Sequence, residues 1–178
     1  MFRFRHPWTR QMAICLLAFG IVGQTATASE LDEARERLAR GDTAGALERA
    51  QQGLVRQPDN AQLRFLQGVA LMDLGRDNQA LAVFRQLNQS YPELPEPLNN
   101  IGLLLARTGQ LEGARQSLQD ALRADPQHRA ARTNLGQVYL MLAVQAWERA
   151  TADVSGRAEP ALLRRLEGAR ALLAQPAS

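Results

Sequence analysis

Residues 61–94 read AQLRFLQGVALMDLGRDNQALAVFRQLNQSYPEL, and residues 95–128 read PEPLNNIGLLLARTGQLEGARQSLQDALRADPQH. The two stretches carry the same residue types at the same phases: a glycine, a second glycine, an alanine, a large apolar residue and a proline. The pairs are Gly68 and Gly102, Gly75 and Gly109, Ala80 and Ala114, Phe84 and Leu118, and Pro92 and Pro126. A fixed period of 34 residues indicates structural repeats that pack against one another.

The first glycine of each stretch lies inside an apolar helical pattern. Glycine at such a position costs about 1 kcal/mol relative to alanine. We therefore expect a neighbouring helix to approach the backbone closely at Gly68 and Gly102, and we expect Ala80 and Ala114 to lie in the same helix crossing.

The second glycine and the proline mark the ends of helices. Gly75 and Gly109 follow apolar helical runs, where a residue with left-handed backbone commonly ends a helix. Pro92 and Pro126 end the second helix of each unit, because proline cannot continue a helix. Each unit is thus predicted to be a helix–turn–helix that buries its apolar face by stacking.

This order of glycine, alanine, large apolar residue and proline at a 34-residue period resembles the tetratricopeptide repeat (TPR). The resemblance covers roughly residues 30–150. It implies an all-α fold, a TPR-type α-solenoid of antiparallel helix pairs wound into a right-handed superhelix. It also implies that the first helix of each unit lines a concave groove that holds a segment of a partner protein.

The sequence predicts six segments. They are a cleavable signal peptide at 1–28, a degenerate first repeat at 29–60, full repeats at 61–94 and 95–128, a partial repeat with a long helix at 129–151, and a C-terminal capping helix at 158–175. In the first repeat Ala34 replaces the first glycine and Ala50 replaces the large apolar residue, as is usual for a terminal repeat.

The first 28 residues have the layout of a secretory signal. Three arginines precede an apolar run at 12–23, which is followed by Ala-Thr-Ala at 26–28 and predicts cleavage before Ser29. The alternative, a membrane anchor, is disfavoured because the run is shorter than the ~20 residues of a span. We therefore expect a periplasmic protein of a Gram-negative bacterium, without a membrane span after cleavage.

Removal of this segment changes the charge and the cysteine content. The chain has 21 basic and 18 acidic residues, and three of its arginines lie in the segment. The remaining chain therefore has 18 basic and 18 acidic residues. The body contains no run of basic residues, which argues against nucleic-acid binding. Cys15 leaves with the signal, so the mature chain has no disulfide.

Acidic residues crowd the predicted first helix, at Glu30, Asp32, Glu33 and Glu36. Asp32 and Glu33 suit the positive N-terminus of this helix. We expect a solvated capping helix here; a surface that binds arginines is the alternative.

The fourth unit begins in phase and then departs from the pattern. No glycine turn follows Tyr139, so a long helix is predicted over 129–151. Beyond a loop, Leu-Glu-Gly-Ala-Arg at 166–170 repeats residues 111–115 letter for letter. The last helix therefore resembles a second helix of a repeat that an insertion has displaced.

The sequence contains no constellation typical of catalysis. His128 follows Asp125 in a predicted turn with no cysteine nearby, so it is predicted to be a surface residue. No phosphate-binding, nucleophile-elbow or zinc-protease motif occurs. We expect no enzyme activity, no cofactor and no metal.

The resemblance implies a groove lined by one face of each first helix. In the first repeat this face holds Leu31, Arg35 and Leu38. The candidate positions in the later repeats are Phe65, Val69, Met72, Asp73, Asn99, Leu103, Arg107, Thr133, Gln137 and Leu140. The chain has no lysine, so it lacks the clamp with which chaperone-binding TPRs hold a C-terminal carboxylate. The expected partner is another protein or peptide; the alternative is a self-associating structural repeat that dimerises through the Trp147 helix.

Overall fold

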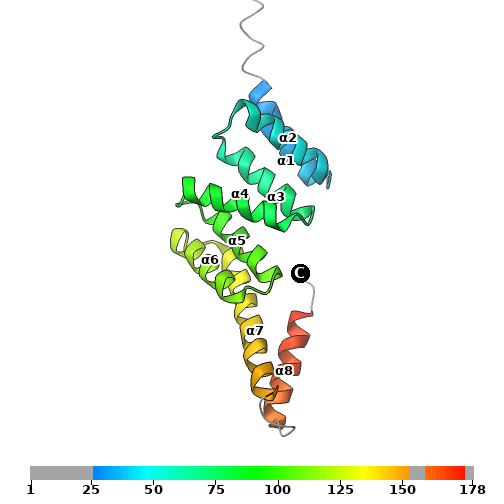
Figure 1. The fold of residues 1–178 in the computed structure, drawn as a ribbon, viewed down its shortest axis with the longest axis vertical. Coiled ribbons are helices and arrows are strands. Elements are labelled where there is room, and N and C mark those ends of the chain that lie inside the picture. Colours follow the sequence, from blue (N-terminus) through cyan, green and yellow to red (C-terminus); the bar gives the residue numbers. More distant parts are fainter. Residues whose placement is uncertain (1–25, 153–158, 175–178) are drawn as a thin grey trace, which may run out of the picture. The chain divides into compact units, whose positions relative to one another are not determined.

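The computed structural model describes residues 26–152 and 159–174, and within these ranges it contains eight helices and no strand (Figure 1). The helices are α1 (Ala26–Ala39), α2 (Thr43–Arg56), α3 (Ala61–Asp73), α4 (Asp77–Ser90), α5 (Pro95–Arg107), α6 (Leu111–Ala124), α7 (Arg129–Ala152) and α8 (Pro160–Leu173). The predicted all-α class is confirmed. Most of the predicted signal peptide lies outside the described residues, and α1 contains its last three.

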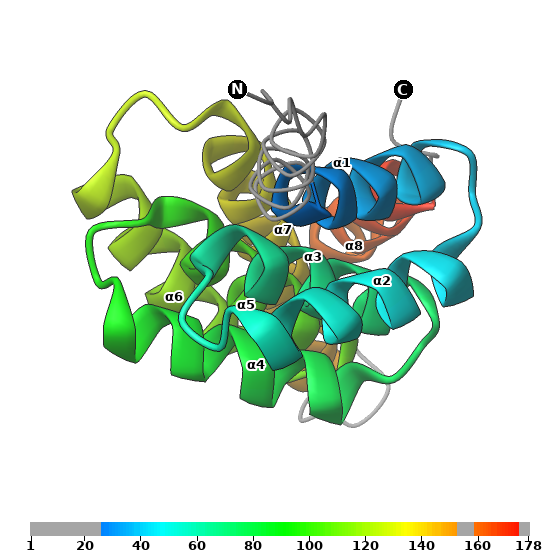
Figure 2. The ribbon, with the colours of Figure 1, turned by 90° about the horizontal axis from the view of Figure 1, so that it is seen from above.

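The chain forms two compact units that divide between Leu66 and Gln67, so that α3 crosses the boundary. The N-terminal unit contains the α1–α2 hairpin and the start of α3. The C-terminal unit contains the rest of α3 and α4 to α8. In it α5 packs against α4, α6 and α7 (Figure 2), and α7 packs against α8 (Figure 1).

Three glycines end first helices in the left-handed conformation. Gly41, Gly75 and Gly109 have φ angles of 78°, 70° and 74°. Only glycine adopts this backbone without steric strain. The predicted turns at Gly75 and Gly109 are therefore confirmed, and the first repeat uses the same device at Gly41.

Two first helices begin at a side-chain cap. Asn60 Oδ1 accepts the backbone N–H of Leu63 at 3.1 Å, and His128 Nδ1 accepts the N–H of Ala131 at 3.1 Å. Such caps satisfy an N–H group that has no partner inside the helix. His128, predicted to be a surface residue, is half-buried, and its ring nitrogen holds the start of α7, a role that was not predicted.

The helical glycines Gly68 and Gly102 lie where second helices cross close to them. A Cβ atom at Gly68 would lie 2.6 Å from Phe84 Cε1, and one at Gly102 would lie 2.6 Å from Leu118 Cγ. Phe84 and Leu118 are fully buried. The close approach predicted from the repeat phases is confirmed in both repeats, 61–94 and 95–128.

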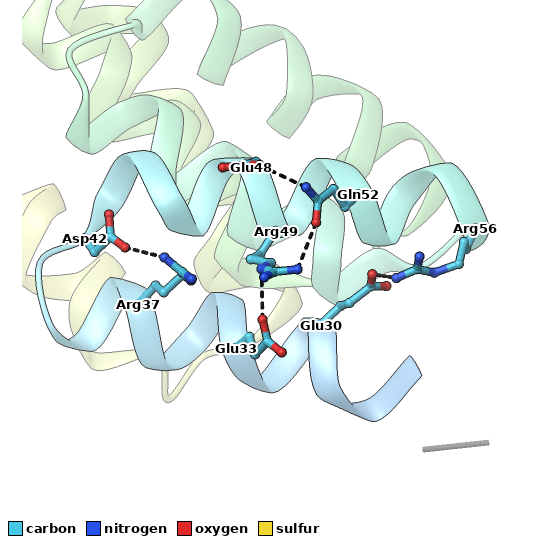
Figure 3. A network of polar contacts seen from close by, with 8 residues as sticks. All are labelled: Glu30, Glu33, Arg37, Asp42, Glu48, Arg49, Gln52 and Arg56. Carbon is cyan, nitrogen blue, oxygen red and sulfur yellow. Dashed lines mark hydrogen bonds and ion pairs between the residues drawn. The ribbon is translucent and has the colours of Figure 1, made fainter. Parts of the chain in front are cut away.

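Ion pairs join the two helices of the N-terminal hairpin (Figure 3). The pairs between α1 and the segment that follows it are Glu30–Arg56, Glu33–Arg49 at 2.9 Å and Arg37–Asp42 at 2.6 Å. Asp42 also accepts the N–H of Gly45 at 3.0 Å. This backbone hydrogen bond, followed by the Arg37 guanidinium, holds the pKa of Asp42 below its usual range.

The structure bears on two expectations for the acidic helix. In the uncleaved chain α1 begins at Ala26, so Asp32 and Glu33 lie beyond its first turn, whereas cleavage before Ser29 would place them in the first turn. The helix is not simply solvated, since Glu30 is only 5% exposed and pairs with Arg56 of α2. The arginines that these carboxylates contact belong to the same hairpin.

The fourth repeat consists of the long helix α7 and the shorter helix α8, which runs back along it (Figure 1). The helix predicted over 129–151 runs over Arg129–Ala152, and α8 packs on it with Leu166 and Ala169 buried. Arg170 donates to Glu148 at 2.5 Å across this hairpin. No helix in the described part of the chain has the length and apolar character of a membrane span.

Candidate functional site

The predicted groove positions lie on three first helices, α3, α5 and α7. Phe65 lies in the N-terminal unit and is half-buried. In the C-terminal unit, Val69, Met72, Leu103 and Leu140 are half-buried, Asp73, Arg107, Thr133 and Gln137 are exposed, and Asn99 is buried. These helices therefore carry both apolar and polar side chains at the predicted positions, and most of these side chains remain accessible in part.

Asn99 forms hydrogen bonds where two repeats pack against each other. Its Oδ1 accepts a hydrogen bond from Asn134 Nδ2 at 2.9 Å, and its Nδ2 donates to Asn100 Oδ1 at 3.3 Å. Asn99 and Asn100 are both buried. This amide pair links α5 to α7, so Asn99 orders the site and its polar atoms already have partners.

Arg107 reaches from the end of α5 to the preceding repeat. Its Nη1 lies 3.4 Å from Asp77 Oδ1 and 3.5 Å from the carbonyl oxygen of Met72. Its side chain is still about half exposed. Long, exposed pairs of this kind contribute little stability, so the guanidinium remains available to a partner.

The seam between α5 and α7 continues past the asparagines. Leu103 lies one turn after Asn99 in α5, and Gln137 lies one turn after Asn134 in α7. Residues three or four apart share a helix face. Leu103 and Gln137 thus lie one turn further along the same helices, and Thr133, next to Asn134 on α7, is exposed.

The described residues contain no group of three or more His, Asp, Glu or Cys side chains that could hold a metal ion. Asp32 and Glu33, adjacent in sequence, pair with different arginines, Arg35 at 3.7 Å and Arg49 at 2.9 Å. His128 caps α7. These groups have structural partners and do not converge on a reactive centre.

A depression of about 440 Å³ lies away from the predicted groove positions and was not predicted from the sequence. Its lining comes from α4, the α4–α5 loop, α5 and α6, and includes Asn88, Leu98 and Arg123. Asn88 Oδ1 is buried, without a hydrogen-bond partner in the described structure. No pattern in the sequence distinguishes Asn88 from the other polar residues of α4.

Comparisons with solved structures agree with the repeat phases. The first TPR domain of human RPAP3 superimposes with a TM-score of 0.62 at 16% identity, over 66% of this chain and 92% of that one. The second TPR domain of human RPAP3, in complex with an HSP70 peptide, gives 0.59 at 20% identity, over 64% and 94%.

A bacterial structure is similar to the same extent. The Yersinia enterocolitica type III secretion chaperone SycD, in complex with a peptide of the translocator YopD, gives a TM-score of 0.61 at 14% identity, over 66% of this chain and 95% of that one. At these identities the likeness concerns the fold.

The family follows from the sequence match. A profile described as tetratricopeptide repeat matches residues 31–95 and 99–175, which together make up most of the chain. The second match extends over α7 and α8. The chain belongs to the tetratricopeptide repeat family.

Proposed function

We propose that this protein is a non-enzymatic interaction scaffold that binds a segment of another protein along the first-helix face of its C-terminal unit. The observation that carries the proposal is the row formed by Leu103, Arg107, Thr133, Gln137 and Leu140, in which apolar and polar side chains remain accessible. An apolar surface with a few polar contacts suits an amphipathic segment of a partner. Solved relatives hold peptides of HSP70 and YopD.

The composition narrows the class of partner. The chain contains no lysine, so a lysine clamp for a C-terminal carboxylate cannot form. Arg107 is the exposed cation of the row. Arginine binds carboxylates in a planar, bidentate geometry, so we propose an internal segment that presents apolar residues beside an acidic side chain.

We also propose that the scaffold acts in the periplasm of a Gram-negative bacterium, on the basis of the signal-like sequence at 1–28. N-terminal sequencing of the protein recovered from the cell envelope is expected to begin at or near Ser29. Recovery of the intact chain from the cytoplasm would exclude this location.

The binding face is tested by obstructing it. The double variant Thr133→Arg and Gln137→Arg places bulk and charge on the α7 part of the row, at two exposed positions. Cross-linked capture of a given envelope partner is expected to fall at least tenfold, while the melting temperature stays unchanged. Gln86→Arg, at an exposed position of α4, is the matched control and is expected to retain capture.

A finer test concerns Arg107. Arg107→Ala is expected to weaken capture about fivefold, or roughly 1 kcal/mol, with little effect on thermal stability, because its ion pair is long and exposed. Unchanged capture by both the Arg107 and the double variant would show that this face does not recognise the partner.

A further inference from the structure

The start of α7 depends on a side chain of the type that changes its charge near neutral pH. His128 is half-buried in the turn before α7, and its Nδ1 accepts the N–H of Ala131 at 3.1 Å. The first N–H groups of a helix have no acceptor inside the helix, so this hydrogen bond supplies a missing partner. Histidine is the side chain that ordinarily gains its proton between about pH 8 and about pH 5.

Protonation of the ring and capping of the helix exclude each other. A neutral imidazole has one acceptor nitrogen, whereas a protonated imidazole carries a hydrogen on both nitrogens and can only donate. A proton on Nδ1 of His128 would therefore face the N–H of Ala131. It would also add positive charge at the N-terminus of α7, where the helix dipole is already positive. The cap is thus present while the ring is neutral and is lost as the pH falls.

The charged side chains around the α6–α7 turn do not offset this loss. They are Asp125 and Arg129 beside the turn, Arg132 in the first turn of α7, the Asp120–Arg123 pair of α6, and Glu96 in the first turn of α5. Asp125 Oδ1 accepts the N–H of Gln127 at 2.8 Å, and Arg132 donates to the carbonyl oxygen of Pro126. Among the described residues, no carboxylate forms an ion pair with the ring of His128.

The chain contains a matched cap that cannot change its charge. Asn60 stands two repeat periods before His128, and its Oδ1 accepts the N–H of Leu63 at 3.1 Å. Both caps bind the N–H of the third residue after them. An amide oxygen remains an acceptor whether the solution is neutral or mildly acidic. The N–H groups of Leu63 and Ala131 therefore report on the same kind of cap, with and without a titrating acceptor.

The cap lies close to the hydrogen bond that joins α7 to α5. Asn134, three residues after Ala131, donates to Asn99 of α5 at 2.9 Å. The later turns of α7 also pack on α6 and α8. Loss of the cap therefore releases the first turn of α7, while these contacts hold the rest of the helix.

We propose that His128 is a proton-sensitive switch at the start of α7. The neutral ring caps the helix and orders its first turn, and the protonated ring releases that turn. The device goes beyond the proposed function, because it needs no partner. Its test uses the protein alone, so its failure would leave the partner-binding proposal untouched.

Nuclear magnetic resonance of the full-length chain tests the switch at the atoms concerned. Between about pH 8 and about pH 5, the protection of the Ala131 N–H against hydrogen exchange, corrected for the intrinsic rate, is expected to fall as the His128 ring gains its proton. The expected fall is about threefold, in line with the loss of one helix cap. The protection of Leu63 is expected to stay constant.

Three results would overturn the proposal. One is a ring at His128 that stays neutral down to about pH 5. Another is protection of Ala131 that does not change as the ring is protonated. The third is an equal fall at Leu63, which would show a general loosening of the chain.

Stability gives a second readout, with substitutions that remove only the titration. His128→Asn keeps an acceptor and His128→Ala has none, and neither side chain gains a proton in this range. Between about pH 8 and about pH 5, the unfolding equilibrium constant of the wild type is expected to rise about threefold more than that of either variant. The carboxylates titrate alike in all three proteins, so their contribution cancels. A wild type with the same pH response as both variants in urea unfolding would overturn the proposal.

Discussion

The α5–α6 pair and the α7–α8 pair start from the same repeat pattern and reach different packing. In the first pair, a turn at Gly109 sends α6 back across α5, and Leu118 is fully buried over Gly102. In the second, no turn follows Tyr139, α7 continues to Ala152, and Gly136 stays exposed. A glycine at this position of the repeat permits close helix packing. A second helix can pack there only if a turn after the first helix reverses the chain.

The comparison predicts its largest difference at the leucines of the two second helices. Leu118→Ala is expected to lower the free energy of unfolding by about 2–5 kcal/mol, because it leaves a cavity at a fully buried site. Leu172→Ala, at a mostly exposed site, is expected to change it by less than about 0.5 kcal/mol in the monomer. Urea unfolding at low protein concentration measures both. Similar losses would mean that α8 is buried like α6.

Enlarging the first-helix glycines should give the next largest effect. Gly68→Leu and Gly102→Leu are each expected to cost about 1–3 kcal/mol, since the added side chain meets Phe84 or Leu118 at less than contact distance. Thermal and urea melts of the two variants provide the measurement. A wild-type melting temperature in either one would show that the second helices do not pack this closely.

A smaller effect is expected at the start of α7. His128→Ala removes the ring nitrogen that accepts the N–H of Ala131, and the loss of such a cap costs roughly 0.5–1 kcal/mol. His128→Asn keeps an acceptor and is expected to recover most of this stability. Equal losses in the two variants, compared by denaturant midpoint, would argue that the ring acts through packing.

The sequence predicted the features that depend on local residue chemistry. Glycine at 75 and 109 needs no tertiary information to end a helix, and the 34-residue phase sufficed to locate the close crossings at Gly68 and Gly102. The long fourth helix followed from the missing turn.

Features that depend on three-dimensional neighbours were missed. The burial of Glu30 depends on its ion pair with Arg56, from the second helix of the hairpin. The hydrogen bond that Asn99 accepts comes from Asn134, in the next repeat. His128 caps a helix although histidine is not among the usual capping residues. The exposure of Gly136 could not be predicted from its position in the repeat, because Gly102 has the same position and is buried.

The most direct test of the account compares Gly136→Ala with Gly102→Ala in urea unfolding, at a concentration at which the protein is monomeric. Gly136→Ala is expected to raise the free energy of unfolding by up to about 1 kcal/mol, because alanine favours the helix and the added Cβ meets no described atom. Gly102→Ala is expected to lower it, because its Cβ would lie 2.6 Å from Leu118 Cγ. Changes of opposite sign in the free energy of unfolding of the two variants would support a fourth repeat in which no helix covers Gly136. A loss of stability in both variants would contradict it, because a second helix would then have to cover Gly136 within the monomer.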